Sequence, residues 1–139
     1  MERHELTPAE AKQFILAGNA TVTVENEQTG GRFTFKVIQP DDSKPHFVRV
    51  LTGNNNETDY TFLGTIFNKA NYRHGRNSRI TEQATSAKAF NWVWAHLADL
   101  PANVHIYHEG RCGRCGRKLT VPSSIKTGFG PECAGKISH

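Results

Sequence analysis

The chain has 139 residues, of which 37% are hydrophobic and 22% are charged. This length suits one domain of ordinary size, and the composition is too hydrophobic for a wholly disordered chain. No uninterrupted apolar stretch approaches the roughly 18 residues that span a bilayer, and residues 1–6 contain no apolar signal core. We therefore expect a soluble, cytoplasmic protein that has no membrane partner.

The basic residues are concentrated in two segments of the chain. Residues 66–90 contain five Lys or Arg and one acid, and residues 110–139 contain six Lys or Arg and one acid. The remainder is net acidic, although the whole chain carries +4. Two basic segments suit the phosphate backbone of a nucleic acid if the fold places them on one surface. The alternative is a pair of solvated loops.

The first half of the chain predicts one helix followed by antiparallel strands. The run Thr-Pro-Ala-Glu at residues 7–10 is a capping-box pattern, and the helix that it starts should continue to about Ala17. After this helix, apolar and polar residues alternate, as in half-buried strands, and Gly30-Gly31 breaks the alternation as a hairpin turn does. We expect strands over residues 20–25, 33–37, 47–51 and 60–66. They would form an antiparallel sheet of three or four strands.

The second half predicts a long loop, a helix and a short final strand. Residues 68–84 are polar, basic and without apolar periodicity, and loops of this length are often functional. Residues 86–98 place Phe90, Val93 and Leu97 on one stripe of a helix that contains both tryptophans. Residues 104–107 alternate again and lead into the cysteines.

The three cysteines predict a metal site. Cys112, Cys115 and Cys133 all lie in the last 28 residues, and an odd number cannot form a complete disulfide set. The two-residue spacing of the first pair, with a glycine after each cysteine, is typical of a loop that wraps a metal ion. Pro131 predicts a helix start, which would place Cys133 in its first turn, where a thiolate is favoured.

A structural zinc site closes at four ligands, so the fourth must be another residue type. His108 is four residues before Cys112, at the end of the last strand, and is our preferred ligand over His139, which is at the terminus. His105 should point to the other side of its strand. We expect zinc, with iron as the alternative metal.

Several motifs resemble one family. The run Tyr107–Thr120, then Ser123–Ile125 and Gly128–Cys133, resembles a family of unknown function that is common in bacteriophage and prophage proteins. Earlier runs that are also similar to full-length members are 50–53, 59–64, 74–76 with 78–79, and 89–94. The resemblance implies a phage or prophage origin, action inside a host bacterial cell, and a metal site that includes His108. It implies no reaction.

Three classes of function are compatible with these features. The first, which we prefer, is nucleic-acid binding through backbone phosphates, with aromatic rings available to stack on unpaired bases. The expected contact residues are Arg73, Arg76, Arg79, Arg111, Arg114, Arg117, Lys118, Lys126, Tyr72 and His74. The second is a protein-interaction module that inhibits or redirects a host enzyme or defence complex.

The third class, an enzyme, is not expected, because no phosphate-binding glycine loop, His-Glu-x-x-His pattern or nucleophile pair is present. A small-molecule ligand is not expected either. We predict an α+β fold with an N-terminal helix, an antiparallel sheet, a Trp-containing helix and a zinc knuckle resembling a treble clef or a ribbon. Residues 1–106 would form the core, and residues 107–139 a knuckle subdomain packed on it or appended to it.

Overall fold

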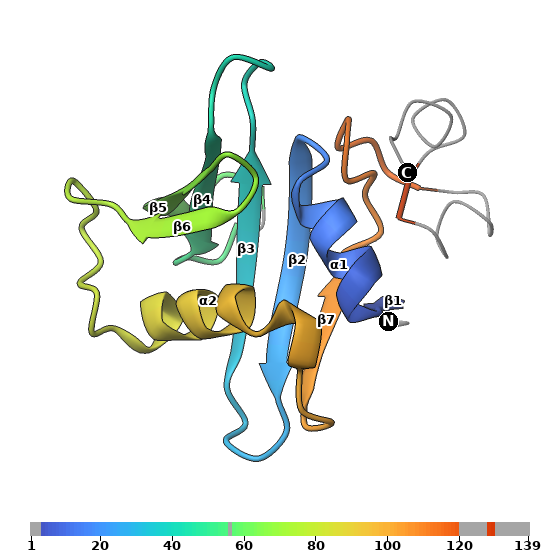
Figure 1. Cartoon of the computed structure of the whole chain (residues 1–139), viewed down its shortest axis with the longest axis vertical. Coiled ribbons are helices and arrows are strands. Elements are labelled where there is room, and N and C mark those ends of the chain that lie inside the picture. Colours follow the sequence, from blue (N-terminus) through green and yellow to red (C-terminus); the bar gives the residue numbers. More distant parts are fainter. Residues whose placement is uncertain (1–3, 56, 120–127, 130–139) are drawn as a thin grey trace.

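Over the described part of the chain, the protein has an α+β fold in which two α-helices cover one face of a seven-stranded antiparallel sheet. The computed structural model describes residues 4–55, 57–119 and 128–129. The strand order is β1-β7-β2-β3-β4-β5-β6 (Figure 1). In chain order the elements are β1 (His4–Leu6), α1 (Pro8–Ile15), β2 (Asn19–Asn26), β3 (Arg32–Ile38), β4 (His46–Leu51), β5 (Tyr60–Phe67), β6 (Asn71–His74), α2 (Thr85–Ala95), a 3-10 turn (Leu97–Asp99) and β7 (Val104–His108).

The first helix starts at the predicted capping box. The Thr7 side chain accepts a hydrogen bond from the Glu10 backbone N–H, and the Glu10 carboxylate accepts one from the Thr7 backbone N–H at 2.9 Å. These bonds satisfy two N–H groups that a helix start leaves without partners. The helix ends at Ile15, two residues before the expected position, and Gly18 then turns the chain with φ at +124°.

The centre of the sheet is the predicted meander. Strands β2 and β3 form a hairpin in which Ala20 is opposite Val37 and Val24 is opposite Phe33. The apolar residues of the central strands face the helices and form the core. Its largest fully buried side chains are Phe14, Phe35, Phe90, Ile15, Leu63, Ile66, Ile106, His46, Val22, Val37, Val48 and Val50.

The predicted sheet of three or four strands is too small. Strand β6 lies inside the segment 68–84 that we expected to be a loop, and it pairs with β5 at the edge of the sheet. Its sequence, Asn-Tyr-Arg-His, has no apolar alternation, because an edge strand need not bury a full face. Strand β1 is only three residues long, so it gives no period-two signal.

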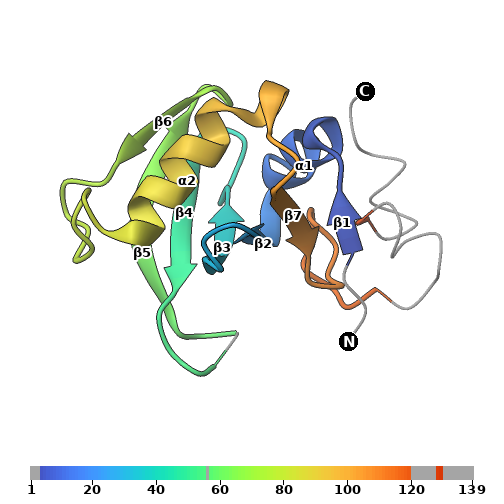
Figure 2. The same cartoon turned by 90° about the horizontal axis from the view of Figure 1, so that it is seen from below.

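Helix α2 packs its buried side across the strands. The Phe90 ring lies 5.0 Å from the Phe35 ring of β3 and 4.9 Å from the Tyr72 ring of β6, measured between centroids. Trp92 is on the outer side of the helix, 40% exposed, with its ring stacked on His96. Both helices lie on the same side of the sheet (Figure 2). Among the residues that the structure describes, no helix covers the opposite face, which we call the open face.

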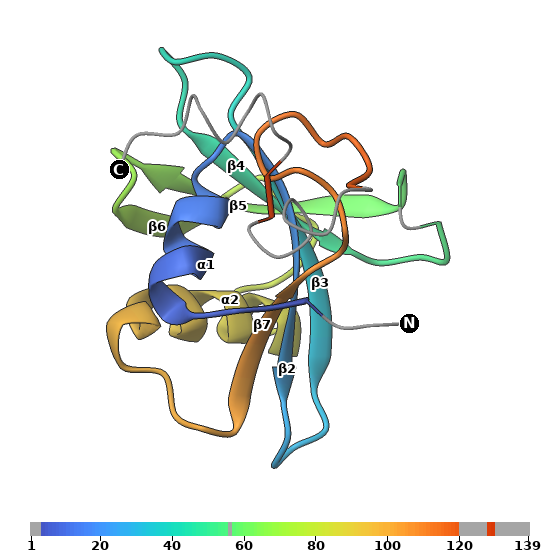
Figure 3. The ribbon, with the colours of Figure 1, turned by 90° about the vertical axis from the view of Figure 1, so that its right-hand side faces the viewer.

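After β7 the chain forms a tight hairpin, residues 110–119, which we call the knuckle hairpin. The Cys112 N–H donates to the Arg117 carbonyl at 2.9 Å, and the Leu119 N–H donates to the Gly110 carbonyl at 2.8 Å. Cys112, Leu119 and Phe129 are buried in the same core cluster as the helices and strands. The knuckle hairpin is therefore packed against the main body, close to α1 (Figure 3).

The expected division between residues 106 and 107 falls inside strand β7. This strand pairs with β1 on one side and β2 on the other, so it is integral to the sheet. Whether residues 107–139 behave as a subdomain stays a prediction, because 120–127 and 130–139 lie outside the described residues.

Candidate nucleic-acid interface

The open face of the sheet is basic over strands β3 to β6. In the pairing register Lys36 is directly opposite Arg49, and residues opposite each other point to the same face. The neighbouring residues Val37 and Val48 are buried on the helix face, so Lys36 and Arg49 point away from the helices. By the same alternation Arg32 and Arg73 are on the open face. No Asp or Glu occurs within the ranges of these four strands.

Aromatic rings accompany these cations. Phe62 is opposite Arg49 in the register, and the rings of Phe47 and Phe62 lie 6.5 Å apart. The Lys36 ammonium lies 4.8 Å from the centroid of the Tyr60 ring, within the range of a cation–π contact. Cations and partly exposed rings on one surface are the combination that binds single-stranded nucleic acids.

A cleft of about 860 Å³ lies at one end of this face. Thr21, Thr34 and Lys36 line it from β2 and β3, and the knuckle hairpin lines it through Arg111 and Cys115. Other lining residues are Asn19, Arg32, Leu51, Glu57, Tyr60, Glu109 and Gly116. The cleft is therefore built by the sheet, the knuckle hairpin and the loop between β4 and β5.

Arg111 is held in place at the rim of the cleft. One guanidinium nitrogen lies 2.9 Å from the Glu57 carboxylate, and the other donates to the Gly116 carbonyl at 3.3 Å. The side chain of Glu109, also at the cleft, accepts a hydrogen bond from the Thr23 hydroxyl. Both acids of the cleft are thus engaged by other groups.

The electrostatic environment of the cleft disfavours a further positive charge. Burial lowers the pKa of Lys36, and the positive charges of Arg111 and Arg49 lower it further, while Glu57 acts in the opposite direction. Burial raises the pKa of Tyr60, with a further contribution from Glu109. A bound anion would relieve the repulsion among the cations around Lys36.

Some of the expected contact residues join this surface. Arg73 is on the open face of β6, and Arg111 is at the cleft. Arg114, Arg117 and Lys118 are exposed on the knuckle hairpin. Lys126 lies outside the described residues. The two basic segments of the sequence are not adjacent, because β6 and β7 are separated by four strands, and Lys36 and Arg49 occupy the space between them.

The other expected contact residues lie elsewhere. The Tyr72 ring packs on Phe90 and its hydroxyl is buried, so our expectation that Tyr72 stacks on a base is not supported. The Nε2 atom of His74 donates to the Ile80 carbonyl at 2.8 Å, which closes the turn after β6. Arg76 lines a separate cleft next to α2, to which Arg73 also contributes from the edge strand. Arg79 is exposed on the same turn. Period-two alternation along β6 places Tyr72 and His74 on the helix face and Arg73 on the open face.

Three cations of the open face, Arg32, Lys36 and Arg49, were not among the contact residues expected from the sequence. They lie outside the two segments that have the largest charge surplus, in a part of the chain that is acidic on average. The available signal was the distribution of charge within the strands, where the bases alternate with core residues and no acid occurs. The described acids that give the rest of the chain its negative average lie in other strands, in α1, in the 3-10 turn and in the connecting loops.

The knuckle hairpin has the backbone expected of the first cysteine pair. Gly116, directly after Cys115, has φ at +77°, a conformation that glycine adopts without strain. Cys112 is fully buried and Cys115 is exposed. In the parts of the chain that the structure describes, no three His, Cys, Asp or Glu side chains form a metal-binding group. Cys133 and His139 lie outside those parts, so the four-ligand site stays a prediction.

The surroundings of His108 bear on its expected role as the fourth ligand. Its ring is 2% exposed and is stacked between the rings of His4 and Phe14. Its Nδ1 atom accepts a hydrogen bond from the Gly110 N–H at 3.0 Å. A neutral ring in this state carries its proton on Nε2. Ligation through Nδ1 would replace the Gly110 bond, and ligation through Nε2 would move the proton to Nδ1, so either mode requires the loss of that bond. The choice between His108 and His139 therefore stays open.

Comparisons with known proteins place one part of the chain. Residues 102–138 match the model of DUF6011, a family of unknown function. No curated protein and no solved structure matches the chain. Among the described residues, no helix combines the length and the apolar character needed to cross a membrane.

Proposed function

We propose that this protein binds nucleic acid, mainly through backbone phosphates, on the open face of its sheet. The observation that carries the proposal is the set of Lys and Arg side chains on strands β3 to β6, whose ranges contain no Asp or Glu. An antiparallel sheet that is covered on one side only commonly leaves a solvated face, and here that face carries Arg32, Lys36, Arg49 and Arg73. Ligands that are negatively charged along their length fit such a surface.

The arrangement of the cations gives the proposed path of the ligand. Lys36 and Arg49 are cross-strand neighbours, Arg73 lies two strands beyond Arg49, and Arg111 lies at the cleft that contains Lys36. With strands about 4.8 Å apart, the path from β3 to β6 is about 14 Å long. The ligand would cross the strands, with the knuckle hairpin at one end and β6 at the other.

We also propose a zinc ion and a phage-type origin. Zinc bound by Cys112, Cys115, Cys133 and one histidine would fix the knuckle hairpin and hence the position of Arg111. What supports the zinc ion is the spacing of the cysteines and the positive φ of Gly116. The phage-type origin rests on the resemblance of the motifs around the cysteines. The zinc would be structural, since four protein ligands leave no position for a substrate.

The test is a binding titration with fluorescent single- and double-stranded DNA and RNA at several salt concentrations. If Arg32, Lys36, Arg49 and Arg73 each contact one phosphate of a single strand, the logarithm of the association constant should fall with the logarithm of the salt concentration with a slope of about −3. Arg49→Gln should weaken binding and make this slope less steep by about 0.7. The matched control is Lys12→Gln, which removes an exposed charge from α1 on the covered side.

Two outcomes would contradict the proposal. One is the absence of binding to all four nucleic acids at low salt. The other is equal loss of affinity in the Arg49 and Lys12 variants, because the open face would then have no special role. A partner protein that survives nuclease and salt would instead favour the interaction-module hypothesis.

A further inference from the structure

The cleft between the knuckle hairpin and the β4–β5 loop has the features of a specific anion site. Three cations, Arg32, Lys36 and Arg111, line it together with the hydroxyl-bearing residues Thr21 and Thr34. They outnumber the two carboxylates of the lining, Glu57 and Glu109, each of which already accepts a hydrogen bond from another side chain. Its volume of about 860 Å³ is within the range of pockets that hold small organic ligands. These hydrogen-bond donors therefore line a concave site, which a flat basic surface would not provide.

The donors of the cleft are unequally engaged. The two guanidinium contacts of Arg111, to Glu57 and to the Gly116 carbonyl, fix the orientation of its planar group. Arg32 lies 3.9 Å from the Glu25 carboxylate. Within the described residues, no carboxylate lies at ion-pair distance from the Lys36 ammonium. Lys36 therefore has donor capacity for an external anion.

The walls of the cleft suit more than a bare anion. Leu51 and the Tyr60 ring give one side an apolar surface, next to the ammonium of Lys36. A planar base packs well on such a surface, while a phosphate group is matched by a guanidinium and an ammonium. Both groups occur together in a nucleotide.

We propose that this cleft binds one nucleotide unit, with its phosphate group between Lys36 and Arg111 and its base towards Leu51 and Tyr60. The unit is either part of a nucleic acid strand or a free mononucleotide, since both present the same phosphate and base. For the strand-bound case the inference rests on the proposed function. The free case does not require it.

The experiment follows the side-chain Nζ and Cε signals of Lys36 by NMR in the wild-type protein. The probes are inorganic phosphate, adenosine 5′-monophosphate and a single-stranded oligonucleotide of 10 nucleotides (the 10-mer), which has backbone phosphates but no terminal phosphate. Assignment uses Lys36→Gln, which lacks the signals. A change in the Lys36 chemical shifts on addition of the mononucleotide indicates a free-nucleotide site. A change on addition of the 10-mer alone indicates a site for backbone phosphates. Movement with inorganic phosphate to the same extent as with the mononucleotide would contradict the role assigned to the base.

Affinity measurements complete the test. Lys36→Gln should lower the affinity of the probe that moves the Lys36 signals by about ten-fold, and Lys36→Arg should restore most of it. The control is Lys44→Gln, an exposed lysine in the turn between β3 and β4. A thermal melt of each variant verifies the fold.

The results separate this inference from the proposed function. One possible result is that the 10-mer binds without shifting the Lys36 signals and that Lys36→Gln binds it as tightly as the wild type does. The inference then fails and nucleic-acid binding stands. If no nucleic acid binds but the mononucleotide moves the Lys36 signals, the proposed function fails and the nucleotide site stands. If neither probe moves the Lys36 signals, the inference is wrong.

Discussion

The Nε2 atom of His46 donates a hydrogen bond to the Leu16 carbonyl at 2.9 Å, in a position where the histidine is 1% exposed. This bond connects β4 to the end of α1, between two elements that are 30 residues apart in the chain. It supplies a partner to one of the carbonyls that a helix end leaves unsatisfied. The buried imidazole is thus a structural group that is also titratable.

The first prediction concerns stability at mildly acidic pH. Burial lowers the pKa of His46 from its usual 6.5; the Leu16 carbonyl opposes this effect and Lys69 adds to it. The unfolded chain therefore binds a proton at a higher pH than the folded chain does. The free energy of unfolding should fall as the pH drops below about 6.5, until the folded-state pKa is reached. Urea unfolding between pH 5 and 8 measures this dependence.

The variant His46→Gln keeps an N–H donor for the Leu16 carbonyl and removes the titration. Its unfolding free energy should vary less over this pH range than that of the wild type. An identical slope in the two proteins would show that His46 is not the group responsible.

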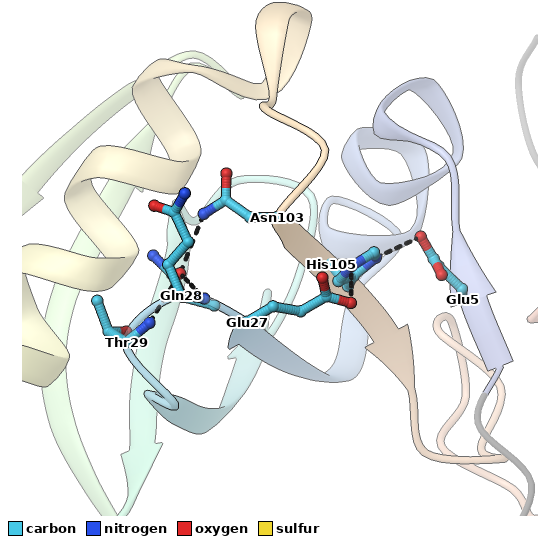
Figure 4. Close-up of polar contacts among 7 residues, drawn as sticks. Glu5, Glu27, Gln28, Thr29, Asn103 and His105 are labelled. Carbon is cyan, nitrogen blue, oxygen red and sulfur yellow. Dashed lines mark hydrogen bonds and ion pairs between the residues drawn. The ribbon is translucent and has the colours of Figure 1, made fainter.

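The second prediction has the opposite sign and concerns His105. Its ring lies between two carboxylates, with Nδ1 at 2.9 Å from Glu5 and Nε2 at 2.8 Å from Glu27 (Figure 4). The hydrogen bond to Glu5 raises the pKa most; burial opposes it, and both carboxylates add to the rise. The charged ring stabilises the fold below about pH 6.5, and this contribution is lost as the pH rises through the folded-state pKa.

A His105→Gln variant should therefore lose stability relative to the wild type at pH 5.5 and differ less at pH 9. Because both carboxylates are largely exposed, 0.5 M salt should reduce the difference. A difference that is constant with pH and salt would indicate a packing effect instead.

The third prediction tests how the knuckle hairpin packs on α1. A Cβ atom on Gly113 would lie 2.7 Å from the ring of Phe14, closer than atoms can approach. Gly113→Ala should cost about 1–3 kcal/mol of unfolding free energy, because the hairpin or the ring must move. Arg117→Ala, an exposed change in the same hairpin, should cost less than about 0.5 kcal/mol. Equal effects in a urea titration would show that the packing is looser than this contact implies.

The fourth prediction concerns the ion pair at the rim of the cleft. Glu57→Gln removes a negative charge that lies 2.9 Å from Arg111. Both groups are exposed, so the stability should change by less than about 1 kcal/mol. The affinity for nucleic acid should increase two- to five-fold at low salt, since an unfavourable charge is lost and Arg111 is released. Glu10→Gln, a charge change on the helix side, is the matched control; a weaker Glu57→Gln complex would contradict the assignment of this rim to the interface.

The fifth prediction concerns metal removal. Atomic absorption should find about one zinc ion per chain, and Cys115→Ser should release it. Cys115 is exposed, so its substitution opens no core cavity, whereas Cys112 is buried and would confound the result. We expect loss of zinc to weaken nucleic-acid binding through Arg111 while the circular dichroism of the helices and the sheet is retained. Full zinc occupancy in Cys115→Ser would exclude this residue as a ligand.

Local chemistry accounts for what the sequence by itself determined. The capping box before α1, the hairpin of β2 and β3, and the glycine after Cys115 depend on residues that are close in the chain, so their patterns could be read directly. The α+β class followed from the same patterns. The spacing of Cys112 and Cys115 likewise predicts a metal site without knowledge of the fold.

Only the tertiary structure decided which charged groups share a surface. The register of β3 against β4 places Lys36 beside Arg49. The pairing of β6 with β5 places Arg73 on the open face, and Tyr72 and His74 on the other face. Sequence segments average the charges of both faces of a strand together with those of its loops. Strand pairing instead sorts them by face with a period of two, so the surface charge emerges only once the partners of each strand are known.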